Sequence, residues 1–482
     1  MQVLKAKLEL AGNVEYFEQL NLTEAIKLGN IKLSRNGPLL NVEIKDERAH
    51  KLILRFRKKL RELLEKNKIG VRRLKVERLE VYIDGEEIVE LPFAKMERTD
   101  RGVKIVLEDL SDDFLKKGNV DRLIKLYKEK VERKKWGGKK EHWELIWESN
   151  KREPIWKGDP TKEMVKRGWV RKYPHQGTWV YLPPFVDLMN TMRRVIFEEI
   201  LEPLRFEEVV LPKLIPFEIW ERTGHAKGIL QEAYFLMVPK KRDPVFFEDV
   251  TDLVKVTREI PTDKLQEKLE LKAGYCYAQC PPFYQLFRGG IVPDSLLPVK
   301  WFDQSGPSFR WEAGGIHGLE RINAFHRVEL VWLGKPEQVI NIRDELLERY
   351  KYVFDEIFEL EWRMAWVTPW YVAHSGETKV EDLNKRIIGT IDFEAWLPFR
   401  GDREKSEWLE FQNISIHGEK FTRPFNIRHQ KGETLWTGCS GIGLERWIVT
   451  LLAQKGMDPD EWPEKFLKYV KRRPKDFKLV NW

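Results

Sequence analysis

Arginines, carboxylates and a phenylalanine alternate between Phe309 and Leu330, in the stretch FRWEAGGIHGLERINAFHRVEL. Arg310 and Glu312 are two residues apart, so on a strand their side chains share one face. The glycines around His317 permit a reversal, after which functional side chains recur at every second position, at Arg321, Asn323, Phe325, Arg327 and Glu329. A guanidinium group can donate two parallel hydrogen bonds to a phosphate, and a phenylalanine ring can stack on a base, so this face suits a nucleoside triphosphate. A solvated hairpin laced with Arg–Glu pairs is the alternative.

The composition indicates a folded chain of two or three domains. Its 482 residues are 34% charged and 12% aromatic and include 19 tryptophans, which argues against disorder. Residues 1–165 carry 38 Lys and Arg against 30 Asp and Glu, whereas the remainder carries 47 of each. A basic module on a neutral body favours a polyanionic partner at the N-terminal end. Lysines that serve solubility alone explain the charge equally well.

No targeting or membrane segment is visible in the sequence. The first ten residues lack the apolar core of a signal peptide, and no apolar run approaches the roughly 18 residues of a membrane span. The three cysteines, Cys276, Cys280 and Cys439, are too few and too far apart for a disulfide framework. We therefore expect a cytoplasmic protein with no membrane partner, whose thiols are available as metal ligands.

The N-terminal part is predicted to combine strands and helices. Val42 to Gly70 has the apolar spacing of a helix that stops at a glycine, Asp84-Gly85 is a hairpin signal, and Asp112 to Lys135 again has helical spacing. We expect an α+β module of antiparallel strands packed on helices over residues 1–165, with a linker that begins at Gly137-Gly138.

The second domain is expected to span residues 166–482. A long helix, roughly Phe185 to Leu201, leads into a strand that ends at Pro212. Residues 240–271 have the pattern of two short helices broken at Pro261, which we interpret as an insertion. A helix–turn–helix is the obvious label for such a pair, but the pattern is common in ordinary insertions, so no DNA partner is expected.

Three segments, taken in order, resemble the three motifs of class II aminoacyl-tRNA synthetases. FEEVVLPKL around Pro212 resembles motif 1, FRWE and FHRVE on either side of a glycine-bearing loop resemble motif 2, and GCSGIGLERW, from Gly438 to Trp447, resembles motif 3. Over nearly its whole length the chain resembles the type-2, methanogen-type seryl-tRNA synthetases of archaea. The resemblance implies an antiparallel-sheet catalytic domain flanked by helices, an N-terminal α+β domain that binds serine tRNA, and a homodimer formed through the motif 1 helix and strand.

The resemblance also implies an active-site zinc ion that binds the amino group of serine. The family holds this ion by Cys, Glu and Cys, and the matching positions here are Cys280, Glu329 and Cys439. Two thiolates and a carboxylate leave the fourth tetrahedral position of zinc open. From spacing alone, Cys276 competes with Cys280, and buried inert thiols are the plainer alternative. Threonyl-tRNA synthetases use one Cys and two His, so the present set favours serine.

The remaining site residues are carried over from the same family. The expected catalytic residues are Arg310, Glu312 and Arg446. The residues expected to bind ATP, which is a substrate, are Arg310, Glu312, Arg321, Phe325, Glu410 and Arg446. Those expected to contact serine are Glu312, Arg327, Trp370, Asn413 and Ser415. Magnesium is expected at Glu410 and Asn413, whose oxygen chemistry suits that ion.

Other enzymes and binding proteins share parts of this pattern. Carrier-protein amino-acid ligases resemble the catalytic core and its zinc but lack the tRNA-binding domain, so the presence of residues 1–165 argues against them. A catalytically silent tRNA-binding paralogue is disfavoured because the arginines and carboxylates of the site are present. Type-1 seryl enzymes carry a long N-terminal coiled coil, whereas this chain has mixed strands and helices there. We therefore expect ATP-dependent activation of L-serine and its transfer to serine tRNA.

Overall fold

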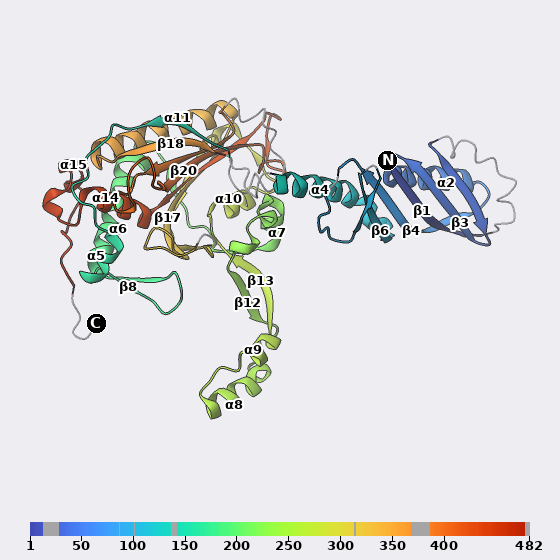
Figure 1. Ribbon diagram of the computed structural model, residues 1–482, viewed down its shortest axis with the longest axis horizontal. Coiled ribbons are helices and arrows are strands. Elements are labelled where there is room, and N and C mark those ends of the chain that lie inside the picture. The colour runs from blue at the N-terminus through green and yellow to red at the C-terminus, as the bar shows by residue number, and fades with distance from the viewer. Residues whose placement is uncertain are drawn as a thin grey trace. The chain divides into compact units, whose positions relative to one another are not determined.

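The structure is a computed structural model, and it describes residues 1–12, 28–85, 87–100, 102–135, 142–312, 315–367 and 386–477. The chain divides into two compact units, Met1–Lys140 and Glu141–Trp482, whose elements are labelled in Figure 1. The predicted domain boundary at residue 165 falls inside the second unit. The reason is that Trp143–Glu148 forms a strand, β7, of the second unit's main sheet.

The first unit is a six-stranded antiparallel sheet with helices packed against it (Figure 1). In spatial order its strands are β2 (Ile31–Asn36), β3 (Leu39–Asp46), β1 (Gln2–Ala11), β4 (Gly70–Ile83), β6 (Gly102–Ser111) and β5 (Lys95–Thr99). Its helices are α2 (Ala49–Glu65), α3 (Asp112–Lys116) and α4 (Asn119–Lys135). Every second residue of β1 is buried, and the apolar ones, from Leu4 to Leu10, pack with Ile53, Phe56 and Leu60 of α2. The predicted α+β character of this part is confirmed.

Two local predictions in this unit were wrong. The helix predicted from Val42 begins later, because Val42 and Ile44 are buried at period two as part of strand β3. Asp84-Gly85 does not close a hairpin, since β4 pairs with β1 and β6 instead. The segment that follows is held by helix α4, where Tyr127 Oη donates to the carbonyl oxygen of Glu87 at 3.3 Å.

The second unit is built on a nine-stranded sheet, and its predicted fold class is confirmed. In spatial order the strands are β10 (Glu207–Glu208), β15 (Val299–Asp303), β17 (Ala324–Gly334), β22 (Trp436–Gly443), β20 (Leu409–Gly418), β19 (Gly389–Ala395), β18 (Trp362–Val367) and β7, with β16 (Pro307–Phe309) paired beside β17. All these pairs are antiparallel except β10 with β15.

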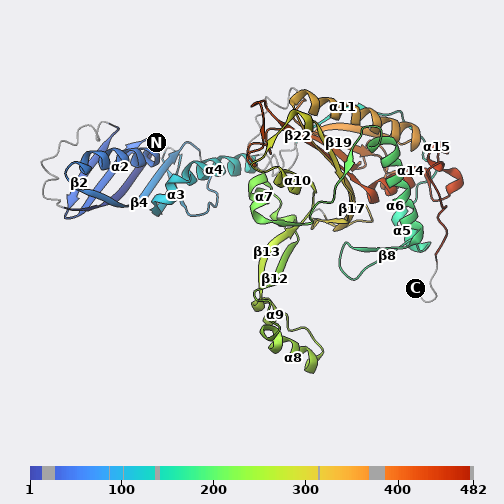
Figure 2. The same cartoon turned by 180° about the vertical axis from the view of Figure 1, so that it is seen from behind.

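Helices cover one face of this sheet (Figure 2). Helices α11 (Pro336–Tyr352) and α14 (Leu444–Lys455) contact β17, β20 and β22, and α6 (Pro183–Ile196) packs against α14. The core between them is rich in aromatic rings, such as Trp332, Phe393 and Trp447. The long helix predicted from Phe185 to Leu201 is present as α6 and a π-helical turn at Phe197–Leu201.

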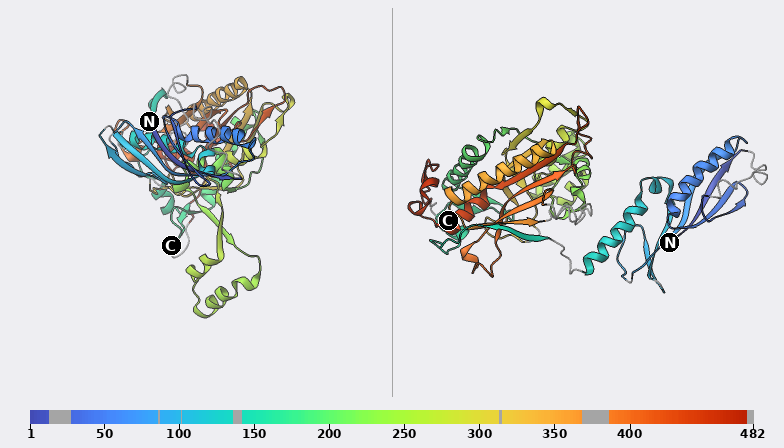
Figure 3. Two further views of the ribbon diagram at one scale, coloured as in Figure 1. Left: turned by 90° about the vertical axis from the view of Figure 1, so that its right-hand side faces the viewer. Right: turned by 90° about the horizontal axis from the view of Figure 1, so that it is seen from above.

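The opposite face of the sheet is only partly covered. It carries α7 (Phe217–Thr223), α10 (Cys280–Leu286) and a small sheet of β11 (Leu214–Pro216), β13 (Leu269–Tyr275) and β12 (Phe235–Pro239). Helices α8 (Glu248–Thr257) and α9 (Thr262–Lys268) lie at the far end of the β12–β13 hairpin, in the predicted insertion (Figure 3). Within the described ranges, no helix has the length and apolarity to cross a bilayer.

Candidate active site

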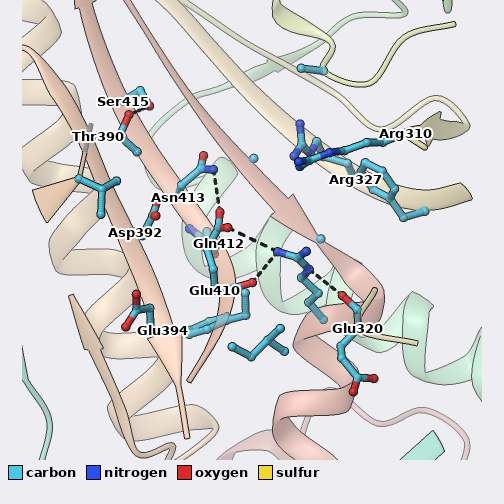
Figure 4. Close-up of a pocket in the computed structure, with 18 of the residues that line it drawn as sticks. Arg310, Glu320, Arg327, Thr390, Asp392, Glu394, Glu410, Gln412, Asn413 and Ser415 are labelled. Carbon is cyan, nitrogen blue, oxygen red and sulfur yellow. Dashed lines mark hydrogen bonds and ion pairs between the residues drawn. The ribbon is translucent and has the colours of Figure 1, made fainter. Parts of the chain in front are cut away.

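A cavity of about 590 Å³ opens on the partly covered face of the nine-stranded sheet. Such a volume is typical of cavities that hold small ligands. Arg310 and Arg327 lie on one side of it, while Glu410, Asn413 and Ser415 follow strand β20 (Figure 4). The cavity therefore places two guanidinium groups opposite a polar wall of carboxylate, amide and hydroxyl groups.

The residues on the floor of the cavity belong to two rows of cross-strand neighbours. The first row is Glu329, Gly441, Asn413 and Asp392, and the second is Val331, Cys439, Ser415 and Thr390. Directly opposed residues share a face of a sheet, so this register brings Glu329, Cys439 and Asn413 to one surface. Gly441 keeps the floor open, because a Cβ there would lie 3.1 Å from the guanidinium carbon of Arg327.

A β-bulge explains why both Glu410 and Asn413 face the cavity. They are three residues apart, so on a regular strand they would point to opposite faces. The register between β19 and β20 shifts at this point and leaves Phe411 as the extra residue. Asn413 Nδ2 consequently donates a hydrogen bond of 3.2 Å to Glu410 Oε1.

Cys280, Glu329 and Cys439 converge at one end of the cavity. Each offers one donor atom, these atoms lie within 4.8 Å of one another, and all three residues are buried. Of the two cysteines that the spacing left open, the cluster contains Cys280. Cys276 is occupied elsewhere, because its Sγ donates to the carbonyl oxygen of Ala278 at 2.8 Å, and burial raises the pKa of its thiol.

The electrostatics of this cluster suit a dication. Burial raises the pKa of Glu329, and Arg327, whose Nη1 donates to Glu329 Oε2 at 3.1 Å, opposes that rise. A hydrogen bond with Cys280, together with burial, raises the pKa of Cys439 well above its usual value. A metal ion would stabilise the deprotonated form of all three ligands. Two sulfurs and one oxygen are also a donor set that zinc accepts, so the residues present fit this ion.

Arg310 is held by a carboxylate that the sequence analysis did not identify. Glu232 Oε2 lies 2.6 Å from both Nε and Nη2 of Arg310. The carbonyl oxygen of Glu232 also accepts a hydrogen bond of 2.8 Å from the Trp311 amide. Because Glu232 contacts both Nε and Nη2 along one edge of the guanidinium group, it fixes the direction in which the Arg310 side chain enters the cavity.

Arg310 and Glu312 were expected on a strand, but β16 ends at Phe309. Both still line the cavity, because Asn323 braces the segment. The carbonyl oxygen of Asn323 accepts from the Arg310 amide, and its Oδ1 accepts from the Glu312 amide, each at 2.9 Å. Asn323 itself is buried and is not among the described residues that line the cavity, so its predicted place on the functional face was wrong. The cause is that strand β17 begins at Ala324, after the irregular segment that contains Asn323.

Arg446 lies in the first turn of helix α14, lines the cavity and contacts two other segments of its wall. Its Nε donates to the carbonyl oxygen of Glu320 at 3.0 Å, and its Nη1 donates to that of Glu410 at 2.5 Å. These two bonds hold the guanidinium plane against the cavity.

The other residues that were expected to bind ATP or serine line the cavity, apart from Trp370. Arg321 Nη2 contacts Glu407 Oε1 at 2.7 Å, and the ring of Phe325 lies 5.4 Å from the guanidinium carbon of Arg327. Trp370 lies outside the described residues.

Strand β19 contributes cavity residues that the sequence analysis missed. Thr390, Asp392 and Glu394 all line the cavity. Thr390 Oγ1 lies 2.7 Å from Ser415 Oγ, and Arg363 Nε donates to Glu394 Oε2 at 2.7 Å. A signal was available, since these polar residues recur at period two in the otherwise apolar segment TIDFE.

Two buried histidines lie at the end of the cavity where Cys280, Glu329 and Cys439 converge. His417 Nε2 is 3.5 Å from Cys439 Sγ, and the rings of His417 and His225 both pack against Phe421. Burial lowers the pKa of each histidine to about 3, so both imidazoles are neutral at pH 7. Neither histidine was singled out from the sequence.

Comparison with protein families matches both units to known domains. Residues 260–455 match the tRNA synthetase class II core domain (G, H, P, S and T), and residues 24–129 match a tRNA-binding domain. The first match contains the cavity residues of β17, β20 and β22.

Several relatives match nearly the whole chain. The type-2 serine–tRNA ligase of Methanothrix thermoacetophila is 44% identical over 92% of this chain and 90% of its own length, and that of Methanococcoides burtonii is 45% identical over 90% and 86%. Among solved structures, M. kandleri SerRS in complex with A. aeolicus tRNASec has a TM-score of 0.83 and 32% identity, with 100% of this chain and 99% of that chain covered. The cytoplasmic serine–tRNA ligase of Naegleria fowleri, at 15% identity and a TM-score of 0.52, shares the fold over 70% of this chain and 66% of its own.

Proposed function

This chain belongs to the type-2 serine–tRNA ligases, a class II synthetase family, and we propose that a zinc ion between Cys280, Glu329 and Cys439 is how its cavity selects serine. The ligase reaction uses ATP to activate serine and then joins the seryl group to tRNA. The observation that carries the zinc proposal is the convergence of two sulfurs and one carboxylate oxygen within 4.8 Å, at the end of an arginine-lined cavity.

When bound, zinc supplies a Lewis-acid position for the deprotonated amino group of serine. The surrounding residues prepare this position. Arg327 favours the ionised form of Glu329 through their 3.1 Å contact. The Nε of Arg327 is buried and has no hydrogen-bond partner among the described residues. Because an unsatisfied buried donor is costly, we assign this N–H to an acceptor oxygen of the bound substrate.

Activation joins the serine carboxylate to the α-phosphate of ATP and expels pyrophosphate, so negative charge grows on oxygens bound to phosphorus. We assign Arg310 to bridge the carboxylate and the α-phosphate, with Glu232 as the group that orients it. Glu312 contacts both substrates. Phe325 and Arg446 enclose the adenine ring, which the aromatic face of one and the guanidinium plane of the other suit.

The polar wall of the cavity completes the proposed substrate sites. Glu410 and Asn413 supply oxygen ligands for magnesium, which when bound adds positive charge beside the leaving pyrophosphate. In the proposed complex with ATP, Arg321 leaves Glu407 and contacts the outer phosphates of the nucleotide. Asn413 and Ser415 contact serine, and the corresponding role of Trp370 stays a prediction.

We assign tRNA recognition to the first unit. The match of residues 24–129 to a tRNA-binding domain and the basic excess of residues 1–165 support this assignment. The relative from M. kandleri was solved in complex with a tRNA. Serine tRNA as the acceptor is part of this proposal. A homodimer through α6 and β10 and a cytoplasmic location stay predictions from family resemblance.

Replacing Cys439 with alanine tests the zinc proposal, with Cys276→Ala as the matched control. Both side chains are buried cysteines of the same core, but Cys276 only donates to a backbone carbonyl. Cys439→Ala should abolish serine-dependent ATP–pyrophosphate exchange, whereas Cys276→Ala should retain it. Thermal unfolding of both variants checks that the fold survives. Full exchange activity in Cys439→Ala would refute the metal's role.

The carrier-protein amino-acid ligases, the alternative from the sequence, differ from this family in the acceptor of the second half-reaction. Charging of serine tRNA and of a carrier protein, measured side by side, separates the two. We expect transfer to tRNA alone, and transfer to a phosphopantetheine arm would overturn the assignment of the first unit.

A further inference from the structure

His417 reaches the metal cluster because strand β20 is irregular at its end. The register between β20 and β22 shifts between Ile416 and Gly418, so His417 sits at the irregularity. Gly418 has a φ of +59°, a conformation that glycine adopts readily. The imidazole points at Cys439, with 3.5 Å between Nε2 and Sγ. His417 is 7% exposed, so this contact lies in a medium of low dielectric constant, where hydrogen bonds are stronger than in water.

The second ring nitrogen determines which tautomer is present. Nδ1 lies 3.1 Å from Thr437 Oγ1 and 3.4 Å from Tyr284 Oη, and both hydroxyls can donate a hydrogen bond. A thiolate ligand can only accept, so the nitrogen beside Cys439 must carry the proton. A neutral imidazole has a single N–H, which leaves Nδ1 as the acceptor that these two hydroxyls satisfy.

We propose that His417 is a positioning residue for the metal site, whose Nε2–H donates to the Cys439 thiolate and thereby strengthens zinc binding. The donor atoms that lie within 4.8 Å of one another are those of Cys280, Glu329 and Cys439, so His417 acts through Cys439 and is not a ligand itself. The bond stabilises the charge on sulfur and orients its lone pairs. Contacts of this kind change metal affinity by about 10- to 100-fold. This inference rests on the zinc site proposed above.

The competing explanation is that His417 only fills space beside Phe421, whose ring centroid lies 4.8 Å away. Three substitutions separate the two roles. His417→Gln keeps an N–H donor near the Nε2 position, His417→Leu keeps the volume without the donor, and His417→Asn retracts the donor toward the backbone. His50→Leu is the control for loss of a buried imidazole, because His50 is 3% exposed, belongs to the first unit and does not line the cavity.

Two measurements on the full-length protein test the inference. Zinc affinity is measured by competition with a chromophoric chelator, and the sulfur-to-metal charge-transfer band is recorded after replacement of zinc by Co²⁺. His417→Leu and His417→Asn should bind zinc about 10- to 100-fold more weakly than the wild type, whereas His417→Gln and His50→Leu should stay within about threefold. The cobalt band should move to lower energy in His417→Leu, because a sulfur without its hydrogen bond is easier to oxidise.

The possible failures are distinguishable. Equal zinc affinity and an unshifted cobalt band in His417→Leu or His417→Asn would overturn this inference alone. An equal loss in His417→Gln would also overturn it, because a change in packing would then explain the effect. An equal loss in His50→Leu would overturn it too, because a general loss of stability would then explain the effect. A wild-type chain that binds no zinc would overturn the zinc site and this inference together.

Discussion

Replacing Glu232 with glutamine tests how the cavity holds Arg310. In the native cavity one carboxylate oxygen lies 2.6 Å from both Nε and Nη2 of that arginine. Glutamine preserves the size of the side chain and one acceptor oxygen but removes the negative charge. The backbone contact between residue 232 and Trp311 does not involve the side chain, so the local fold should survive.

The magnitude follows from the exposure of the pair. A hydrogen bond to a charged group contributes about 1.5–3 kcal/mol. The Glu232 side chain is 14% exposed and that of Arg310 is 30% exposed, so solvent screens part of the interaction and the lower half of this range applies. A loss of about 1.5–2 kcal/mol corresponds to a decrease in kcat/KM of roughly 10- to 30-fold.

The assay is serine-dependent ATP–pyrophosphate exchange, with kcat and KM determined separately for serine and ATP. Glu232→Asp keeps the charge on a shorter arm and should recover part of the loss. Glu337→Gln, which neutralises an exposed carboxylate in the first turn of α11, is the control and should leave exchange unchanged. An unchanged kcat/KM in Glu232→Gln would refute the reasoning, because the charge of Glu232 would then make no contribution to the position of Arg310. An increased kcat/KM would refute it as well, because Glu232 would then compete with the substrates for Arg310.

Three further predictions concern catalysis, domain structure and stability. Arg310→Ala should slow exchange by at least about 100-fold if this arginine stabilises the transition state, and an unchanged rate would contradict that role. A fragment of residues 141–482 should activate serine but not charge tRNA. A fragment of residues 166–482 should lose both activities, because it lacks strand β7. Equal activity of the two fragments would contradict a domain boundary near residue 141. In metal-free protein, the free energy of unfolding should fall as pH drops below about 6.5, by about 1.4 kcal/mol per pH unit for each of His225 and His417. The folded pKa of each is about 3, so only the unfolded chain takes up these protons, and urea unfolding that is independent of pH would contradict this.

Spacing along the chain predicted those parts of the cavity that lie on regular strands. Arg327 and Glu329 are two residues apart on β17, and both reach the cavity face as the period required. Glu410 and Asn413 are three residues apart, and family resemblance alone suggested that they act together. The bulge at Phe411 that unites them depends on the partner strand, which spacing within one strand does not reveal.

Contacts between distant segments account for most of what the sequence did not predict. Glu232 lies 78 positions from Arg310, and nothing near either residue indicates their pairing. Strand β7 looked like part of a linker because its pairing partner, β18, lies more than two hundred residues away in sequence. In the same way, the hairpin signal at Asp84-Gly85 was overridden by the pairing of β4 with β1 and β6. Tertiary pairing and packing determine these features, and local propensity is a weak guide to them.

The central claim is that a metal ion held by two sulfurs and a carboxylate selects serine. Metal analysis of the purified protein, combined with ATP–pyrophosphate exchange across the twenty amino acids, tests it most directly. We predict a zinc ion in each chain and exchange that depends on serine, and removal of the zinc should abolish that exchange. Full serine-dependent exchange by a metal-free chain, or preferential activation of another amino acid, would contradict the account.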